Sequence, residues 1–278
     1  MTAREKLLAE AAKRILITDG AFGTEIQNWK LDEAAYAGDL GLSHDQKGNN
    51  DILALTKPEV PASIHRAYFE AGADIAETNT FSANRISQAD YGAEHLVHAI
   101  NYESAKMARA IADEFEAQDG RPRFVAGALG PTNKTLSLSP DVNDPGYREI
   151  DFDHLKDVYR EQIDALVEGG IDFVLIETVF DTLNAKAGIM AAIEAGEALG
   201  RDLPIMLSMT LTDLSGRNLS GHTVEAFWHA VRHAKPVTIG LNCSFGAEQL
   251  RPHVKTLSNL CDTLIMVGTS FPYVDFLP

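Results

Sequence analysis

A thiol and an amide stand at the end of one short apolar segment near the C-terminus. Residues 237–243 read Val-Thr-Ile-Gly-Leu-Asn-Cys, which predicts a buried strand that presents Asn242 and Cys243 at its carboxyl end. A cysteine thiolate is a good zinc ligand, and a bound zinc ion can in turn deprotonate a substrate thiol. Most free cysteines are instead small buried apolar residues, so this segment alone leaves both interpretations open.

Acidic side chains end three other predicted strands, namely Asp19, Glu77 and Glu177. In a barrel of parallel strands the carboxyl ends meet at the face that binds substrate. Carboxylates at that face suit the ammonium group of an amino acid. Each acidic residue taken singly also fits a helix cap or a loop end. Asp181, which precedes the predicted helix 182–199, is typical of an N-cap.

Asp19 is followed at once by the turn Gly20-Ala21-Phe22-Gly23-Thr24. Glycines directly after a strand let the backbone come close to a ligand and expose N–H groups to an anion, such as the carboxylate of an amino acid. The spacing fits neither glycine-rich phosphate-binding pattern, so no phosphate-binding loop is predicted. A tight turn without a ligand fits the pattern equally well.

The elements that position these residues repeat along the chain. Strands are predicted at 15–19, 73–80, 124–129, 173–178, 204–210, 237–243 and 263–268. Helices are predicted at 3–13, 58–71, 93–117, 153–168, 182–199, 223–234 and 247–260. Long loops are expected at 25–57 and 130–151. A helix–Gly–Asp–strand unit that finishes in Glu-Thr occurs twice, 98 residues apart (168 minus 70).

Strands that alternate with helices predict a parallel sheet with both faces covered. A doubly wound sheet and a (β/α)8 barrel both satisfy this pattern. The regular repetition and the polar strand ends favour the barrel. Residues 270–278 predict no eighth strand. We therefore expect an α/β fold, a TIM-type barrel truncated after the seventh strand, that forms a single domain over residues 1–278.

Charge and composition exclude several classes of function. The 278 residues carry 40 acidic and 24 basic side chains, for a formal net charge of −16. This charge disfavours nucleic acid as a partner, because such binding depends on Lys and Arg that neutralise phosphates. No apolar run is long enough for a transmembrane helix, and the charged N-terminus does not resemble a secretory signal. Two cysteines do not make a disulfide framework, so we expect a cytoplasmic protein with no membrane partner.

Seven motifs occur in one order, and together they resemble the homocysteine-binding N-terminal module of cobalamin-dependent methionine synthases. The motifs lie at 19–24, 47–51, 70–81, 130–133, 139–145, 177–186 and 240–243. The resemblance covers roughly residues 5–266. Betaine–homocysteine methyltransferases are similar in fold and in cysteine pattern, but they match the long loops less well.

The resemblance implies a zinc (β/α)8 barrel that binds homocysteine, activates its sulfur and transfers a methyl group to it, giving methionine. Methylcobalamin is the implied methyl donor, and cobalamin- and folate-binding domains are the implied partners. By position, Cys243 matches a zinc ligand and Glu177 matches the acidic residue near the homocysteine ammonium. Asn242 is expected to help place the ligand or its sulfur. The residues that match the amino-acid-binding loop are Asp19, Ala21, Phe22, Gly23 and Thr24.

The cysteines depart from this family. The family's other two zinc ligands are an adjacent Cys-Cys pair, and this sequence has no such pair. Its second cysteine, Cys261, precedes the predicted strand 263–268 and so lies at the wrong end of a strand for this site. One cysteine cannot hold a zinc ion, and lone histidines such as His222 are not convincing replacements. Two functions therefore stay open: a homocysteine methyltransferase module, and a truncated remnant or amino-acid-binding module without a complete zinc site.

Overall fold

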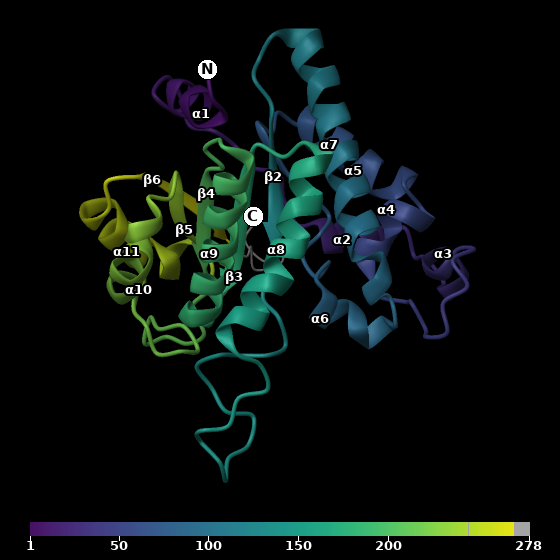
Figure 1. Cartoon of the computed structure of the whole chain (residues 1–278). Helices are drawn as coiled ribbons and strands as arrows, with labels where there is room; N and C mark the ends of the chain where they lie inside the picture. Colours follow the sequence, from purple (N-terminus) through teal and green to yellow (C-terminus); the bar gives the residue numbers. More distant parts are fainter. Residues whose placement is uncertain (244, 270–278) are drawn as a thin grey trace, which may run out of the picture.

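Six parallel strands form one sheet that curls into a half-barrel (Figure 1). The computed structural model describes residues 1–243 and 245–269. The strands are β1 (Ile75–Glu77), β2 (Phe124–Leu129), β3 (Phe173–Val179), β4 (Ile205–Met209), β5 (Thr238–Cys243) and β6 (Leu264–Thr269). They pair in the order in which they occur in the sequence. This sheet confirms the predicted α/β fold of the TIM-barrel type.

Helices cover the outer face of the sheet. The helices that connect successive strands are α7 (Val97–Asp119), α8 (Phe152–Gly169), α9 (Thr182–Leu199), α10 (Val224–Val231) and α11 (Ala247–Leu260). In Figure 1, α8 lies between α9 and α7, and α5 (Glu59–Glu70) lies beyond α7. Helix α1 (Ala3–Ala11) lies at the end of the molecule opposite the long loop that follows β2 (Figure 1).

The side chains of β3 alternate between two cores. Val174 and Ile176 pack in the main core beneath the helices, whereas Phe173 and Leu175 belong to a smaller inner core. The inner core also contains Leu7 of α1, which is 1% exposed, so α1 closes the amino-terminal end of the half-barrel. Because alternate residues of a strand share a face, Glu177 belongs to the inner face at the opposite end.

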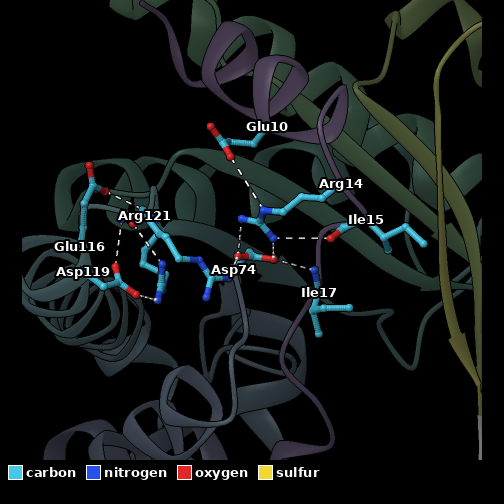
Figure 2. Close-up of polar contacts among 9 residues, drawn as sticks. Glu10, Arg14, Ile15, Ile17, Asp74, Glu116, Asp119 and Arg121 are labelled. Atoms are coloured by element: carbon cyan, nitrogen blue, oxygen red, sulfur yellow. Dashed lines mark hydrogen bonds and ion pairs between the residues drawn. The ribbon is translucent and has the colours of Figure 1, made fainter.

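A buried carboxylate fastens the first part of the chain to β1 (Figure 2). Asp74 accepts hydrogen bonds from both terminal nitrogens of Arg14, at 2.6 and 2.8 Å, and from Nη2 of Arg121 at 2.9 Å. Its Oδ2 also accepts the backbone N–H of Ile17 at 2.9 Å. Burial by itself raises the pKa of Asp74, but these donors and the charge of Arg14 lower it below its usual value. The carboxylate is therefore charged, buried and paired.

Asp172 repeats this arrangement in front of β3. Its Oδ2 accepts the backbone N–H of Val125 on β2 at 2.8 Å and the Nη1 of Arg109, also at 2.8 Å. Each of the two aspartates thus joins the strand that it precedes to the segment beside it. The repeated Gly–Asp–strand unit of the sequence is a repeated anchor at the amino edge of the sheet.

Residues 15–19 do not form the predicted first strand. The segment makes an isolated parallel bridge between Thr18 and Ile75, so the sheet in the described residues has six strands where seven were predicted. Ile15 and Ile17 are 85% and 53% exposed. These apolar residues produced a strand pattern without being buried in a sheet, which explains the error.

The prediction of a loop at 25–57 is wrong. This part of the chain contains most of α2 (Phe22–Asn28), together with α3 (Glu33–Ala37) and α4 (Leu53–Thr56). Ile26, Tyr36 and Leu53 of these helices form a separate apolar cluster with residues of α5. Helices of one or two turns contain too few apolar positions to give a clear periodicity, so the pattern missed them.

The second predicted loop is confirmed. Residues 130–151, all of which the structure describes, contain no helix or strand, and they extend from the carboxyl end of the half-barrel (Figure 1). Among the described helices, none has the length and apolar character needed to cross a membrane.

We expect Asp74→Ala to lower the free energy of unfolding by about 1–3 kcal/mol, because it leaves the backbone N–H of Ile17 without its acceptor and removes the carboxylate that pairs with the partly exposed Arg14 and Arg121. Urea unfolding at pH 7 measures this change. Glu114→Gln is the matched control, since it breaks the exposed pair between Glu114 and Arg66, and we expect no measurable change. Equal stability of Asp74→Ala and the native chain would contradict the anchoring role.

Candidate functional site

The predicted site residues lie at one edge of the sheet. Because all the strands are parallel, their carboxyl ends lie at the same edge, where β1 ends at Glu77 and β5 ends at Cys243. Strand β3 lies between them in the sheet and carries Glu177 and Thr178 near its own carboxyl end. The fold therefore brings together side chains that are far apart in the sequence.

Asp19 sits beside the carboxyl end of β1. Its backbone N–H donates to the carbonyl of Ile75 at 2.8 Å, and its Oδ2 accepts the backbone N–H of Glu77 at 3.0 Å. The side chain is 9% exposed, and within the described residues its Oδ1 has no hydrogen-bond partner. A buried carboxylate oxygen without a donor is costly, so this atom is suited to accept a hydrogen bond from a ligand.

Three acidic side chains, Asp19, Glu77 and Glu177, form the acidic cluster of the site. Burial, together with the charges of Glu77 and Glu177, raises the pKa of Asp19 well above its usual range. Burial and the charge of Glu77 do the same for Glu177. Burial raises the pKa of Glu77 to about 7. Carboxylates this close together resist ionisation near neutral pH, and a cation that entered the cluster would relieve their repulsion.

The turn after Asp19 leads directly into a helix. Ala21 is the N-cap of α2, and Phe22, Gly23 and Thr24 form its first turn. Within the described residues no side chain caps this helix, so its first N–H groups are available to other acceptors. The prediction of a turn thus holds for Gly20 and Ala21, whereas Phe22 to Thr24 are helical.

Two side chains of α5, His65 and Tyr68, pack against this turn. The ring of Phe22 lies 4.7 Å from that of His65, which is buried and whose pKa is lowered by burial to about 3. His65 is therefore neutral. The hydroxyl of Tyr68 lies so close to Gly20 that an added Cβ would approach its oxygen to 2.9 Å. A side chain at residue 20 would therefore require the ring of Tyr68 to shift.

The motif at 47–51 packs against the chain that leaves β1. Asn79 Nδ2 donates to the backbone carbonyl of Asn50 at 2.7 Å, and the buried Asp51 accepts the N–H of Ser82 at 3.1 Å. The amide nitrogen of Asn50 lies 3.8 Å from the position of a Cβ built on Gly23. This motif therefore supports the α2 side of the site.

Asn242 and Cys243 end β5, as predicted. The Cys243 thiol is exposed and accepts a hydrogen bond from Nδ2 of Asn242 at 3.2 Å. Cys261 directly follows α11, and the parallel pairing of β5 with β6 places it at the opposite edge of the sheet from Cys243. Cys261 therefore lies away from the site, at the amino end of a strand as predicted.

The donor set at Cys243 does not fit zinc. Within residues 1–243 and 245–269, no group of three or more His, Cys, Asp and Glu side chains is arranged to hold a metal ion. A zinc site takes at least three protein ligands, so Cys243 supplies one thiolate and the described residues do not complete the coordination.

Sequence reasoning assigned no role to Ser208 or Tyr68, and left Glu77 outside the amino-acid-binding set. A signal for Glu77 was present, because Glu77-Thr78 and Glu177-Thr178 end the two repeated units. Ser208 is buried in β4, where its hydroxyl donates to Oδ1 of Asn242 at 2.7 Å, and Tyr68 comes from α5. Neither has a motif of its own, because each acts through a contact with a distant segment.

These features define a class: a parallel βα half-barrel with a largely buried acidic cluster at its carboxyl edge. The model of the family Homocysteine S-methyltransferase matches residues 16–271. The match covers most of the chain, so this protein belongs to the homocysteine S-methyltransferase family.

Solved structures agree with the fold. The Escherichia coli homocysteine methyltransferase MmuM is similar in its metallated form, with a TM-score of 0.74 and 22% identity over 95% of this chain and 86% of that one. Its oxidised form gives a TM-score of 0.74 and 22% identity over 96% and 86% of the two chains. Its apo form gives a TM-score of 0.64 and 21% identity over 95% and 85%.

The acidic cluster predicts a pH dependence of stability. The pKa of Glu77 is raised to about 7 in the folded state, so the folded chain holds this proton more tightly than the unfolded chain does. The protonated Glu77 therefore contributes fully to the stability of the folded chain below the pKa that this side chain has in the unfolded chain. This contribution is lost as the pH rises through the pKa of about 7 that it has in the folded chain. We expect Glu77→Gln to be about 1–3 kcal/mol more stable than the native chain at pH 8 and nearly equal to it at pH 4.5. Urea unfolding at both pH values tests this, and a constant difference between the two would contradict it.

Proposed function

We propose that this chain binds homocysteine at the carboxyl edge of its half-barrel as the acceptor of a methyl group, giving methionine. The observation that carries the proposal is the unpartnered Oδ1 of Asp19 within the acidic cluster. An ammonium group suits this position, because it brings several N–H donors and a positive charge into a group of repelling carboxyls. Family membership makes the α-ammonium of homocysteine the candidate cation.

The other end of an amino acid is an anion, and the turn after Asp19 is suited to it. The N–H groups of Phe22, Gly23 and Thr24 belong to the first turn of α2, which lacks a side-chain cap within the described residues. In the proposal these groups face the carboxylate of homocysteine while Asp19 and Glu177 face its ammonium. The sulfur then extends toward Asn242 and Cys243.

We extend the proposal to the methionine synthase type, with residues 1–278 as one homocysteine-binding domain. In that type, methylcobalamin on a neighbouring domain supplies the methyl group, and a folate-binding domain recharges it. The support for this extension is the order of the seven sequence motifs. Cys243 is proposed as one thiolate ligand of zinc. No chemical step is assigned to the metal, because the described donors do not complete a zinc site.

One observation favours a second candidate function. Among the described residues the donor set at Cys243 is too small for zinc, whereas the acidic cluster needs no metal to attract an ammonium group. The chain would then be an amino-acid-binding module that does not transfer a methyl group by itself.

We expect L-homocysteine to bind at least about tenfold more tightly than 4-sulfanylbutanoate, which keeps the thiol and the carboxylate but lacks the ammonium. Loss of a charge-assisted contact accounts for a difference of this size. Asp19→Asn and Glu177→Gln should each weaken homocysteine binding and reduce the difference in affinity between homocysteine and 4-sulfanylbutanoate. Calorimetric titration measures both ligands, and Glu248→Gln in α11 is the control. Equal affinity for the two ligands would refute an ammonium site at the acidic cluster.

We expect the purified 278-residue chain to retain far less than one zinc ion per chain after dialysis. The physical reason is the shortage of ligands, since a protein zinc site takes at least three. Metal analysis of the native chain and of Cys243→Ala measures this directly. A stoichiometric zinc ion that disappears in Cys243→Ala would contradict the expectation and would favour the zinc-dependent transferase over the binding module.

A further inference from the structure

A second cavity lies apart from the acidic cluster, among the helices at the carboxyl end of the half-barrel. Its volume is about 260 Å³, and it opens to solvent between α6 (Arg85–Gln88), the first turns of α8 and the start of the loop 130–151. Figure 1 shows α6 and the amino-terminal turns of α8 at the same end of the molecule. The residues that line the cavity belong to helices and to this loop, and none of them is a member of the acidic cluster. We propose that this cavity binds a zwitterionic amino acid with a compact apolar side chain.

Side chains of opposite charge face this cavity. Lys134 lies near the start of the loop, and Glu94 begins the short helix η3 (Glu94–Leu96). Among the described residues, neither side chain forms an ion pair or a hydrogen bond, either with the other or with a third group. Both residues are half-buried, and a half-buried charge gains more from a counter-ion than an exposed one does. A ligand that carries both a carboxylate and an ammonium pairs with both side chains at once.

The backbone of Lys134 is already fixed in place. Its carbonyl accepts the hydroxyl of Thr132 at 2.7 Å and Nδ2 of Asn184 in α9 at 2.8 Å. Oδ1 of the same Asn184 accepts the backbone N–H of Leu136 at 2.9 Å, so the start of the loop is bound to α9 at two points. This part of the cavity wall therefore does not have to be ordered when a ligand binds, which lowers the entropic cost of binding.

Arg85 supplies a further donor. Its Nε and Nη2 donate to the carboxylate of Glu161 in α8, at 3.0 and 2.5 Å, and this pair ties α6 to α8. The hydrogen bonds and the charge of Glu161 raise the pKa of Arg85, and the charge of Glu94 contributes to the same shift. The remaining nitrogen, Nη1, donates to no group among the described residues. It is therefore available to the carboxylate of a ligand, together with Lys134.

Part of the lining is apolar. It consists of Ile86 of α6, Ala89 directly after α6 and the buried Val158 of α8. Contact with these residues stabilises an aliphatic side chain, because it removes apolar surface from water. A volume of about 260 Å³ is just below the range of roughly 300–1,000 Å³ that is usual for drug-sized ligands, so the cavity suits a smaller molecule.

An ion of a single sign fits this lining less well. A simple anion pairs with Lys134 but is repelled by Glu94, and a simple cation has the opposite difficulty. His154, in the first turn of α8, also lines the cavity, and a neutral imidazole donates or accepts a hydrogen bond without a fixed charge. The two unpaired charges and the apolar surface together select a zwitterion with an apolar side chain.

The test is calorimetric titration of the 278-residue chain with three probes of similar length. L-Norleucine carries both charged groups, hexanoate lacks the ammonium and pentylamine lacks the carboxylate. We expect saturable binding of L-norleucine and an affinity at least about tenfold lower for each of the other two, because each of them leaves one charged side chain unpaired. Equal binding of hexanoate or pentylamine, or no saturable binding of L-norleucine below about 10 mM, would overturn the proposal.

Variants assign the binding to this cavity. Lys134→Met and Glu94→Gln each remove one charge and should weaken L-norleucine binding at least about fivefold. Ala89→Phe fills the cavity and should abolish the binding, and because Ala89 is exposed the larger side chain does not disturb the core. The matched controls are Lys255→Met in α11 and Glu197→Gln in α9, which change exposed residues outside the cavity and should leave the affinity unchanged.

Asp19→Asn separates this cavity from the acidic cluster, which also attracts an ammonium group. L-Norleucine binding that is lost in Ala89→Phe and kept in Asp19→Asn supports the inference, whether or not homocysteine binds at the acidic cluster. Binding that is lost in Asp19→Asn and kept in Ala89→Phe would assign L-norleucine to the acidic cluster and overturn it. Native affinity in both Lys134→Met and Glu94→Gln, each shown by circular dichroism to be folded, would overturn it as well.

Discussion

The burial of Asp74 between Arg14 and Arg121 is the constraint on which the placement of the site depends. Its carboxylate also accepts the N–H of Ile17, so the segment 14–19 is held against β1 although it makes only an isolated bridge to it. Asp19 is at the end of this segment and in turn accepts the N–H of Glu77. A polar anchor at the amino edge of the sheet therefore fixes an acidic residue at the carboxyl edge.

The acidic cluster shows that the site is electrostatically strained before a ligand binds. A buried carboxylate is normally paired, as Asp74 is with Arg14 and Arg121. In the acidic cluster burial raises the pKa of all three carboxyl groups, and neighbouring carboxylate charges raise the pKa of Asp19 and Glu177 further. One oxygen of Asp19 also lacks a partner in the described part of the chain. Unrelieved repulsion of this kind is typical of functional sites, because a ligand supplies the missing charge.

Strand β3 connects the acidic and the sulfur-bearing parts of the edge. A regular strand directs successive side chains to opposite faces, which would separate the roles of Glu177 and Thr178 completely. The irregular pairing at 177–179 and the left-handed conformation of Thr178 change this geometry. As a result Glu177 contributes to the acidic cluster, whereas Thr178 forms hydrogen bonds with the side-chain amide of Asn242, at 3.2 Å through its backbone N–H and at 2.8 Å through its hydroxyl. The same two residue types end β1, as Glu77 and Thr78, without a left-handed residue.

The sequence by itself determined the fold class, the family and most of the residues at the carboxyl edge. Repeated helix–Gly–Asp–strand units and polar strand ends are local patterns, and a parallel sheet brings such ends to one edge whatever its exact curvature. It failed for residues 15–19 and 25–57, because Ile15 and Ile17 are exposed and the short helices lack a measurable period. Only the tertiary structure decided that Glu77 joins Asp19 and Glu177, that Tyr68 closes on Gly20 and that Ser208 fixes Asn242. Each of these is a contact between segments far apart in the chain, and such contacts depend on how strands and helices pack rather than on any pattern within one of them.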